Sequence, residues 1–441
     1  MPNNIDLSAE VLVVGSGPGG AAVARELSLK GKDVLILERG YDYRNKFYYG
    51  TYLGAMRYSE RMSLLYTEEG LNIIAPIMVG GATSMYCGCA ANPPAWLKDR
   101  YGVDIDAEVK EVTAELGIRP LPEDLRGAAS TRIARAGQSL GYDWFPQPKF
   151  IRPDRSRRQG KRFNCQANCM LGCRCGAKWN AAEWVEEALA AGARLRQGTR
   201  VIAVKTENGR FTALEGKIRG VPFTAAADTV VLSSGGIGTP RILQNSGLQG
   251  AGVGMTMDTT VMIYGASRDK GTGKEPPMTW SCENDDAGYM LSTLTDPWLM
   301  YPLAAVHKGF GPALSWLRWN KMMGVMIKLK DDISGGVYPT GKISKPLTEN
   351  DTDKLNNAFE VCRRILIEAG AIKSSIFMRP LIGTHPSGTV RIGNLVDSDL
   401  KTEIEGLYVC DASVFPEALD RPTVLTIIGL AKRLSRHLIR R

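Results

Sequence analysis

The sequence predicts an α/β fold that contains a nucleotide-binding unit of the Rossmann type and at least one further compact unit. Two observations lead to this prediction. The stretch Val11–Gly40 has the strand, glycine turn, helix and strand order of a βαβ unit. The chain has 441 residues, so two or three compact units are expected rather than one core. An apolar content of 44% and a charged content of 23% are typical of a globular protein.

The βαβ unit begins with an apolar run, Val11–Val14, followed by a glycine-rich turn. In the GxGxxG pattern of Gly15, Gly17 and Gly20, the first glycine allows the tight turn and the second lets backbone approach a pyrophosphate. The third lets the following helix, expected over 21–30, lie close to the strand. The N-terminus of that helix presents unpaired N–H groups and the positive end of its dipole to the phosphates. We therefore predict that a dinucleotide binds here.

A second apolar run, Asp33–Leu37, completes the unit and ends at Glu38. Glu38 lies 18 positions after Gly20 and is expected to accept hydrogen bonds from a ribose 2′-OH, which disfavours a 2′-phosphate. We expect the next residue, Arg39, to contact the same cofactor.

The rest of the chain alternates between regular elements and irregular stretches. The turns at 80–81 and 233–240 each follow an apolar run and offer backbone N–H groups to a phosphate or a flat ring. Residues 250–375 are rich in aromatic and methionine side chains and have little periodicity. Helices are expected over 96–117, 125–141, 182–192, 241–245, 351–369 and from about 424, and strands over 200–206, 211–217, 229–232 and 407–410.

The formal net charge of +9 is concentrated in two basic runs, residues 152–162 (RPDRSRRQGKR) and the C-terminal KRLSRHLIRR. Neither run has interleaved aromatic residues or a nucleic-acid-reading module, so we expect no nucleic-acid partner. An acidic protein or an anionic lipid surface fits the charge better. The absence of a signal peptide and of an apolar window of about 18 residues predicts a cytoplasmic protein, with peripheral contact at the inner face of the membrane as the alternative.

Nine cysteines in a cytoplasmic protein favour metal or redox chemistry over a disulfide framework. Four of them, Cys165, Cys169, Cys173 and Cys175, fall within 11 residues with the spacing Cx3Cx3CxC. Interleaved glycine and amide residues indicate a loop that can wrap thiolates around one centre. Sulfur-only ligation suits an iron–sulfur cluster or zinc, and a structural or disulfide role is the remaining alternative.

Five blocks of the sequence resemble, in their order along the chain, the glucose–methanol–choline (GMC) family of FAD-dependent oxidoreductases. They are the N-terminal fingerprint, GGATSMYCGCA (80–90), ADTVVLSSGGIGTPRILQNSGL (227–248), HPSGT (385–389) and LYVCDASVFP (407–416). The resemblance implies a Rossmann-like FAD-binding domain assembled from discontinuous segments, 1–95, 176–250 and 376–441. It also implies a helical insertion (96–163), the cysteine-rich loop (164–175) and an α+β substrate domain with an antiparallel sheet (251–375).

The cofactor implied is FAD, because only one GxGxxG follows a predicted strand and no second site for NAD(P)H is expected. Asp411 looks like the family's contact to the ribityl–pyrophosphate region, and the helix N-terminus after Pro422 would face the flavin N1/O2 edge. The residues expected around FAD are Gly15, Gly17, Gly20, Glu38, Arg39, Gly80, Gly81, Ser84, Val201, Gly235, Asp411 and Ala412.

Oxidation of a C–OH group needs a base for the hydroxyl proton while a hydride passes to the flavin. Of the three histidines, His385 lies in the motif HxxGT, at the position of the family's catalytic histidine. The second member of the family's pair, usually His or Asn, corresponds here to Arg421 or Pro422. An arginine would bind a carboxylate or enolate oxygen, so we predict His385 and Arg421 as catalytic residues.

The segment CMLGCRCGAKWN (169–180) is similar to the cluster-binding segment of GMC sugar dehydrogenases that carry a three-iron cluster beside FAD. Cys169 and Cys173 match ligand positions there. Cys165 would be the third ligand, and Cys175 would make the cluster four-iron. Such a cluster would pass electrons to a carrier other than O2, and the preceding basic run would steer an acidic electron-carrier protein.

Three functions are compatible with these observations. The first is an FAD and iron–sulfur dehydrogenase of alcohols or sugar-like hydroxyl groups, with His385 as the base. The second is a flavin-dependent C–C desaturase or ene-reductase, which the missing second His or Asn favours. The third is a flavin and iron–sulfur electron-transfer subunit of a larger complex. Tryptophan and methionine residues gathered between about 287 and 330 suit an apolar substrate pocket or an interfacial patch, so the substrate is expected to be a hydroxylated or apolar small molecule.

Overall fold

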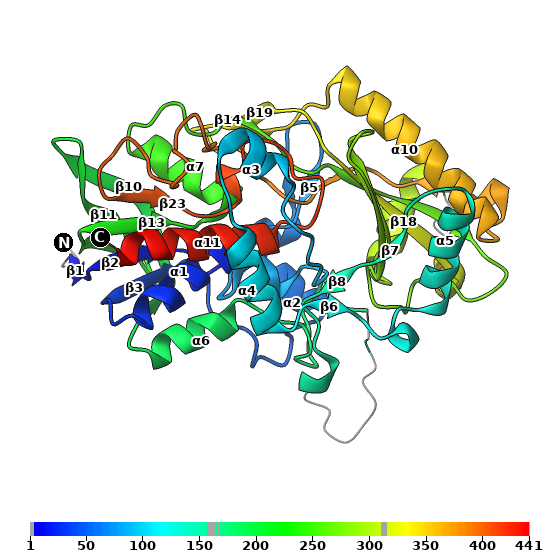
Figure 1. Ribbon diagram of the computed structural model, residues 1–441, viewed down its shortest axis with the longest axis horizontal. Coiled ribbons are helices and arrows are strands. Elements are labelled where there is room, and N and C mark those ends of the chain that lie inside the picture. Colours follow the sequence, from blue (N-terminus) through cyan, green and yellow to red (C-terminus); the bar gives the residue numbers. More distant parts are fainter. Residues whose placement is uncertain (1–3, 157–164, 166, 310–314, 441) are drawn as a thin grey trace.

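A computed structural model describes residues 4–156, 165, 167–309 and 315–440 of the chain. Figure 1 shows two regions side by side. One contains both chain ends and is built around β2, α1 and α11, and the other is built around β18 and α10. The architecture confirms the predicted α/β fold.

The region with the chain ends is organised by a parallel sheet. Its strand order is β23 (Leu407–Val409), β13 (Thr229–Leu232), β2 (Val11–Val14), β3 (Val34–Glu38) and β9 (Arg194–Gln197). Every side chain of β2 and β3 is buried, as expected of apolar strands covered on both faces. A second sheet packs against β3 and consists of β1 (Ile5–Ser8), β12 (Val221–Ala226), β11 (Arg210–Ile218) and β10 (Thr199–Glu207).

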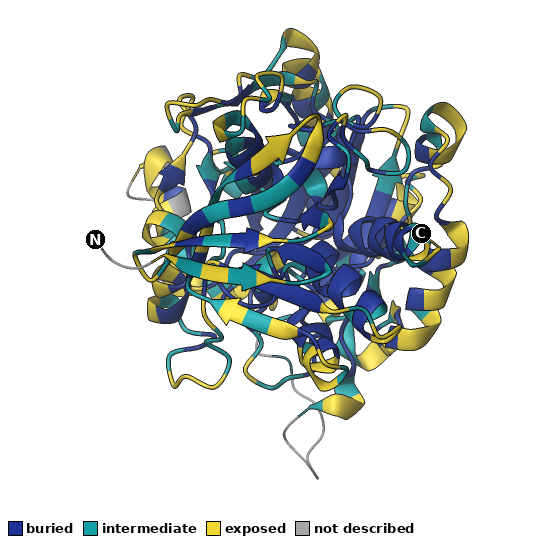
Figure 2. Ribbon diagram, turned by 90° about the vertical axis from the view of Figure 1, so that its left-hand side faces the viewer, coloured by how far each residue is buried: buried dark blue, intermediate teal, exposed yellow. Residues whose placement is uncertain are grey.

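Four helices cover the parallel sheet or pack on one another beside it. They are α1 (Pro18–Ser28), α4 (Asp106–Leu116), α6 (Ala182–Ala190) and α11 (Val424–Ile439). Helix α1 packs against both α6 and α11, and α4 packs against α11. Figure 2 shows α11 almost wholly in the colour of buried residues beside the C-terminus. The C-terminal helix is therefore part of the core.

Three basic residues of the C-terminal run, Lys432, Arg433 and Arg436, are paired with carboxylates of the protein. Lys432 donates to Glu26 of α1 at 2.7 Å and to Glu111 of α4 at 2.8 Å. Arg436 is bonded to Glu108 and Glu111. In the other basic run, Arg152 is paired with a glutamate at 2.8 Å, while residues 157–162 lie outside the described residues. Lys432 thus joins α11 to α1 and α4, and Arg436 joins α11 to α4.

The second region is built on a sheet that is mainly antiparallel. Its strands are, in order, β4 (Leu65–Tyr66), β5 (Asn72–Ile73), β22 (Ile382–Gly383), β15 (Thr260–Ala266), β18 (Met322–Leu329), β17 (Tyr289–Thr293), β16 (Trp280–Asn284) and β7 (Phe145–Pro146), with β21 (Phe377–Met378) also paired to β15. Segments from 65–73 and 145–146 therefore contribute strands to this sheet, in addition to those of the predicted substrate domain at 251–375.

The two faces of this sheet have different surroundings. Alternate side chains of β15 and β18, such as Val261 and Val325, form a core with α5 (Ala128–Ser139) and α10 (Glu349–Glu368). The intervening side chains point the other way, because successive residues of a strand alternate between faces. This second face carries Met262, Tyr264, Met290, Met322 and Met326, which form a separate buried cluster.

The predicted helical insertion at 96–163 is divided between the two regions. The structure has α3 (Trp96–Tyr101) and α4 where one helix was expected, because Gly102 adopts a φ of +67° and ends α3. Helix α4 packs on α11, whereas α5 packs on α10. The remaining elements are α2 (Tyr52–Arg57), α7 (Gly235–Asn245), α8 (Met300–Ala305), β6 (Arg119–Pro120), β8 (Pro148–Lys149), β14 (Val253–Met255), β19 (Ser334–Val337) and β20 (Ile343–Ser344). No helix within the described ranges is both long and apolar enough to cross a membrane.

Candidate active site

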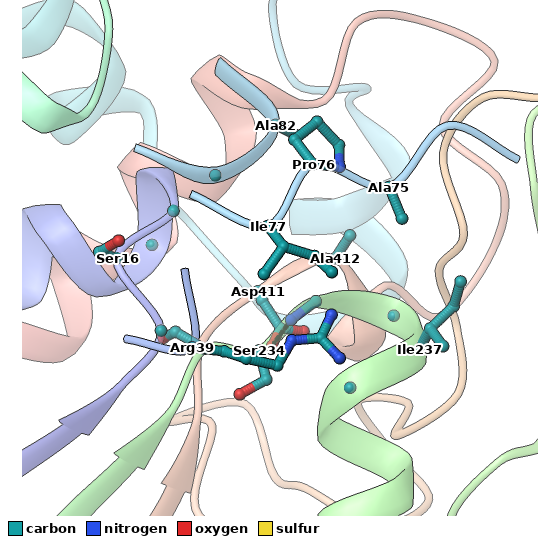
Figure 3. Close-up of a pocket in the computed structure, with 18 of the residues that line it drawn as sticks. Ser16, Arg39, Ala75, Pro76, Ile77, Ala82, Ser234, Ile237, Asp411 and Ala412 are labelled. Atoms are coloured by element: carbon teal, nitrogen blue, oxygen red, sulfur yellow. Dashed lines mark hydrogen bonds between the residues drawn. The ribbon is translucent and has the colours of Figure 1, made fainter. Parts of the chain in front are cut away.

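A cavity lies where the carboxyl ends of β2, β13 and β23 meet, and it extends to the loop that follows β22 (Figure 3). Its wall contains Gly15, Gly17, Glu38, Arg39, Gly81, Val201, Gly235, Asp411, Ala412 and His385, all named from the sequence. A further part of the wall, residues 73–78, was not named. The apolar run before the paired glycines at 80–81 was its only signal in the sequence.

The glycines of the first turn have three different surroundings. Gly15 has a φ of +99°, and a Cβ added there would strike the carbonyl of Ser233 at the end of β13. A Cβ on Gly20 would strike the carbonyl of Gly15, so this glycine lets α1 lie against the turn. At Gly17 an added Cβ meets nothing within 4 Å, which leaves open space in front of the α1 N-terminus. That space is where a pyrophosphate needs room.

Glu38 is hydrogen-bonded to the glycine-rich turn that forms part of the cavity wall. Its Oε2 accepts hydrogen bonds from the N–H of Ser16 at 3.0 Å and from the Ser16 hydroxyl at 2.6 Å. Its Oε1 accepts from the N–H of Gly40 at 2.6 Å. Glu38 therefore braces the glycine turn while also forming part of the cavity wall. Arg39, which Figure 3 shows at the cavity, is paired with Glu60 at 2.9 Å.

Asp411 fixes the neighbouring glycine turn. Its Oδ2 accepts from the N–H of Gly235 at 2.8 Å and from the hydroxyl of Thr239 at 2.6 Å, so it joins β23 to the first turn of α7. Burial raises the pKa of Asp411, and the hydrogen bonds from Ser413 and Thr239 oppose that shift. Its place at the carboxyl end of β23 puts it in the cavity wall with Ala412.

Gly80 and Ser84, which were also named from the sequence, lie behind the wall. Gly80 directly precedes a short 3-10 helix, η2 (Gly81–Ser84), and Ser84 is the last residue of that helix. The N–H of Gly80 donates to the Ser16 hydroxyl at 3.3 Å, and the Ser84 hydroxyl accepts from Asn180 at 3.0 Å. These bonds tie η2 to the glycine turn and to the loop before α6.

The N-terminus of α11 closes another side of the cavity, where Thr423, Val424 and Ile427 form its wall. The side chain of the N-cap residue, Thr423, makes no capping hydrogen bond. The first N–H groups of a helix have no partner inside it, so this end offers donors and positive potential to a bound group.

His385 is at the edge of the cavity and is bonded to a carboxylate that the sequence did not reveal. Its Nδ1 lies 2.7 Å from Oδ2 of Asp258, which is fully buried between β14 and β15. The other oxygen of Asp258 accepts from the N–H of Asp420 at 3.1 Å. An ionised Asp258 accepts the Nδ1–H of His385 and leaves the lone pair on Nε2. The arrangement prepares His385 to take a proton through Nε2.

Lys328 adds a positive charge beside this pair. Its ammonium donates to the hydroxyls of Thr384 at 2.7 Å and Thr260 at 3.1 Å. Burial, and then the charge of Lys328, lower the pKa of His385 well below 6.5. Burial raises the pKa of Asp258 to about 6, against the opposing effect of Lys328. Near neutral pH the histidine is therefore neutral and the carboxyl is mostly ionised.

Arg421 is placed differently from the prediction. Its guanidinium is bonded to Asp420 at 2.8 Å, to Glu283 at 3.0 Å and to Asp285 at 2.5 Å, and it is not part of the cavity wall. Three carboxylates occupy three of its five N–H donors, and the side chain is buried, so it does not reach a substrate oxygen in the cavity. We revise its role to a structural one, joining the loop before α11 to the end of β16.

The four clustered cysteines form two pairs. The Sγ atoms of Cys173 and Cys175 are 3.4 Å apart, and the thiol of Cys165 is hydrogen-bonded to Cys169. An iron–sulfur cluster needs three or four thiolates around one centre. Among the described residues, no group of three or more His, Cys, Asp or Glu side chains is arranged to hold a metal ion. The predicted ligands do not fit a cluster in this arrangement, and we derive no step through one.

Comparison with known proteins identifies the family. The N-terminal and C-terminal profiles of GMC oxidoreductases match residues 52–260 and 336–431, and an FAD-binding domain profile matches residues 8–47. Together the two GMC profiles cover most of the chain.

Individual proteins agree with these profiles. An uncharacterized protein of Methanocaldococcus jannaschii is 26% identical, over 97% of this chain and 99% of its own length. A long-chain-alcohol oxidase of Arabidopsis thaliana is 23% identical, over 98% of this chain and 67% of its own length. The crystal structure of pyridoxine 4-oxidase from Mesorbium loti superposes with a TM-score of 0.71 at 16% identity, over 98% of this chain and 99% of that one, and so shares its fold. The chain belongs to the GMC oxidoreductase family and is an FAD-dependent oxidoreductase.

Proposed function

We propose that the protein oxidises a hydroxyl group of a small molecule to a carbonyl group, with His385 as the catalytic base. The observation that carries the proposal is the contact between Nδ1 of His385 and the carboxylate of the buried Asp258, 2.7 Å long, at the edge of the FAD cavity. A base with a lowered pKa and a fixed tautomer is what removal of a hydroxyl proton requires.

The residues of the cavity fit FAD. The open space at Gly17 and the first turn of α1 would hold the pyrophosphate, and Asp411 would hold the ribityl–pyrophosphate region. The free N–H groups at the start of α11 would lie at the pyrimidine edge of the flavin. When bound there, FAD supplies the acceptor for a hydride from the substrate carbon.

The chain itself handles the proton. Nε2 of His385 accepts the hydroxyl proton, and the carboxylate of Asp258 stabilises the positive charge that develops on the imidazole. Thr384, held by Lys328 at 2.7 Å, fixes the backbone directly before His385. The charge of Lys328 also lowers the pKa of His385, so the imidazole is neutral before the substrate binds.

We propose an apolar alcohol as the substrate class. The face of the antiparallel sheet that carries Lys328 also carries a methionine-rich cluster, and methionine side chains are flexible enough to repack around an apolar chain. The relationship to a long-chain-alcohol oxidase favours the same class. No observation in the structure favours the desaturase or the electron-transfer subunit, so neither is carried forward.

The predicted exit of electrons through an iron–sulfur cluster is not part of the proposal, because the cysteines do not fit one. The predicted acidic carrier protein rested on the basic run at 152–162 beside that cluster, and residues 157–162 lie outside the described residues, so this partner is not carried into the proposal. The prediction of a carrier other than O2 rested on the same cluster and is not carried forward either. Reoxidation of the substrate-reduced protein by air, compared with reoxidation by a quinone and by a cytochrome, identifies the acceptor.

The proposed base is tested with His385→Asn, using His437→Asn on α11 as the matched control. We expect His385→Asn to lower kcat by about 100- to 10,000-fold with primary alcohols of increasing chain length, because general base catalysis contributes that much. The FAD content of both variants should equal that of the parent protein. Turnover by His385→Asn within twofold of the control would remove His385 from the mechanism.

A further inference from the structure

Two further thiols lie near the cysteine-rich loop, in addition to the four within it. Cys87 and Cys89, which follow η2, interact electrostatically with Cys169. Cys169 is 4% exposed, while Cys173 and Cys175 are partly exposed. The segment therefore extends from a buried thiol to thiols that solvent can reach.

Two buried lysines face these thiols without carboxylate partners. Lys149 is 1% exposed and its ammonium donates to the carbonyl of Cys87 at 2.8 Å and to Sγ of Cys89 at 3.0 Å. Lys178 is 3% exposed and its ammonium donates to the carbonyl of Cys169 at 2.9 Å. Among the residues that the structure describes, no carboxylate is within 4.0 Å of either ammonium. Burial raises the pKa of the Cys87 and Cys89 thiols, and the charge of Lys149 opposes that shift.

Cys173 is the thiol best placed to become a thiolate. Its Sγ lies 3.4 Å from that of Cys175. The hydrogen bond with Cys175, and further the charge of Lys178 and the backbone N–H groups of Lys178 and Gly176, lower the pKa of Cys173 below that of an ordinary thiol. The same hydrogen bond, and then burial, raise the pKa of Cys175, so Cys175 keeps its proton.

The backbone around the pair is held in place. Gly172 has a φ of +123° and packs against the ring of Tyr49, and the hydroxyl of Tyr58 is bonded to the carbonyl of Leu171. A disulfide bond is about 2.05 Å long. The two Sγ atoms, now 3.4 Å apart, need to approach by only a little more than 1 Å, which rotation of the side chains can provide.

We propose that Cys173 and Cys175 form a reversible dithiol–disulfide site that reacts with hydroperoxides, in place of a metal–sulfur cluster. The Cys173 thiolate attacks one oxygen of the hydroperoxide, the O–O bond breaks, and the alkoxide or hydroxide that leaves takes up a proton. Cys173 is then a sulfenic acid. Sγ of Cys175 attacks the Cys173 sulfur, the S–S bond forms, and the sulfenic oxygen leaves as water with the proton of Cys175. Two thiols lose two electrons, and the hydroperoxide is reduced to an alcohol, or to water when it is hydrogen peroxide.

The test uses the full-length, FAD-loaded protein, purified without oxygen and titrated with hydrogen peroxide. Thiols are then alkylated and each cysteine-containing peptide is weighed by mass spectrometry. We expect one equivalent of peroxide to produce a disulfide between Cys173 and Cys175, which a dithiol reductant reverses. In Cys175→Ser the sulfenic acid at Cys173 should persist and be trapped by dimedone. In Cys173→Ser neither product should form at this segment.

Cys165→Ser is the matched control, because it removes a thiol of the same segment and leaves the Cys173–Cys175 pair intact. It should form the disulfide as the parent protein does. Iron content and electron paramagnetic resonance of the same preparation decide between this site and a cluster. Stoichiometric iron, a disulfide between other cysteines, or absence of a dimedone adduct in Cys175→Ser would overturn the proposal. None of these readouts depends on alcohol oxidation, so failure here leaves the proposed function standing.

Discussion

Replacement of Asp258 by asparagine tests the assignment of His385 most specifically. The substitution keeps the shape of the side chain and removes its negative charge, 2.7 Å from Nδ1 of His385. Asp258 is fully buried and the side chain of His385 is 24% exposed, so salt screens their interaction less than that of an exposed pair. A hydrogen bond to a charged group contributes about 1.5–3 kcal/mol. At about 1.4 kcal/mol per factor of ten, kcat/KM should fall by about 10- to 150-fold.

The second part of this prediction concerns the dependence of kcat/KM on pH. In the parent protein the first proton taken up on acidification enters the Asp258–His385 pair with an apparent pKa near 6, because burial raises the pKa of Asp258 to about 6. The acid limb of kcat/KM should lie there. Asp258→Asn leaves only His385, whose pKa burial lowers well below 6.5, so the limb should move to lower pH.

The assay is steady-state turnover of a primary alcohol with an artificial electron acceptor, from about pH 5 to about pH 9. Glu275→Gln is the control, because Glu275 also accepts backbone hydrogen bonds, at the start of α5 and away from the cavity. Its kcat/KM should match that of the parent protein. If Asp258→Asn retains full FAD and its kcat/KM and pH profile both equal those of the control, the reasoning about the pair is refuted.

Three further outcomes are expected. In the unfolded parent chain His385 gains a proton below pH 6.5, and in the folded protein Asp258 gains one near pH 6, so their effects on the unfolding free energy nearly cancel. Asp258→Asn removes the uptake by the folded state. This variant should therefore lose about 1.4 kcal/mol of unfolding free energy per pH unit below 6.5, measured by denaturant titration. Gly15→Ala should bind FAD at least about tenfold more weakly, read from the flavin-to-protein absorbance ratio, whereas Gly31→Ala, with a similar positive φ and no close neighbour, should bind it normally. Arg421→Met should lower the unfolding free energy by about 3–5 kcal/mol because it leaves the buried carboxylate of Asp420 unpaired, with kcat per bound flavin unchanged. Loss of activity without loss of stability would restore its catalytic role.

The nucleotide-binding unit could be predicted from the sequence because its signals are local. Val11–Val14 and Asp33–Leu37 were read as strands from their apolar runs, and the structure has β2 and β3 there. Gly15 was read as a turn residue and has the positive φ that excludes other residues. Each of these features depends on neighbours within a few positions, so a motif can carry it.

The partner of His385 could not be predicted in this way. Asp258 is 127 positions away in the sequence, in a turn without a motif, and the pairing of β22 with β15 and the bridge between Thr256 and Ser387 bring the two together. Arg421 was assigned from its place in an alignment, but its partners Glu283 and Asp285 come from another strand and its neighbouring turn. Contacts between distant segments decide both cases, and local pattern gives no information about them.

The cysteines show the same limit. Their spacing indicated that thiols gather, which the structure also has, but spacing does not fix how far apart folded side chains lie. The 3.4 Å separation of the Cys173 and Cys175 sulfurs depends on the folded path of the loop, and Lys178 is placed by the carbonyls of Ser84, Tyr86 and Cys169.

The central claim, that this chain removes a hydride and a proton from a hydroxyl-bearing carbon, is tested most directly by mixing the FAD-loaded protein with an apolar primary alcohol in the absence of oxygen. The account predicts that the visible absorbance of oxidised flavin disappears in one turnover and an aldehyde forms in equal amount. The alcohol deuterated at the reacting carbon should react several-fold more slowly, and His385→Asn should leave the flavin oxidised. A flavin that stays oxidised with every alcohol offered to the parent protein, while remaining reducible by dithionite, would contradict the account.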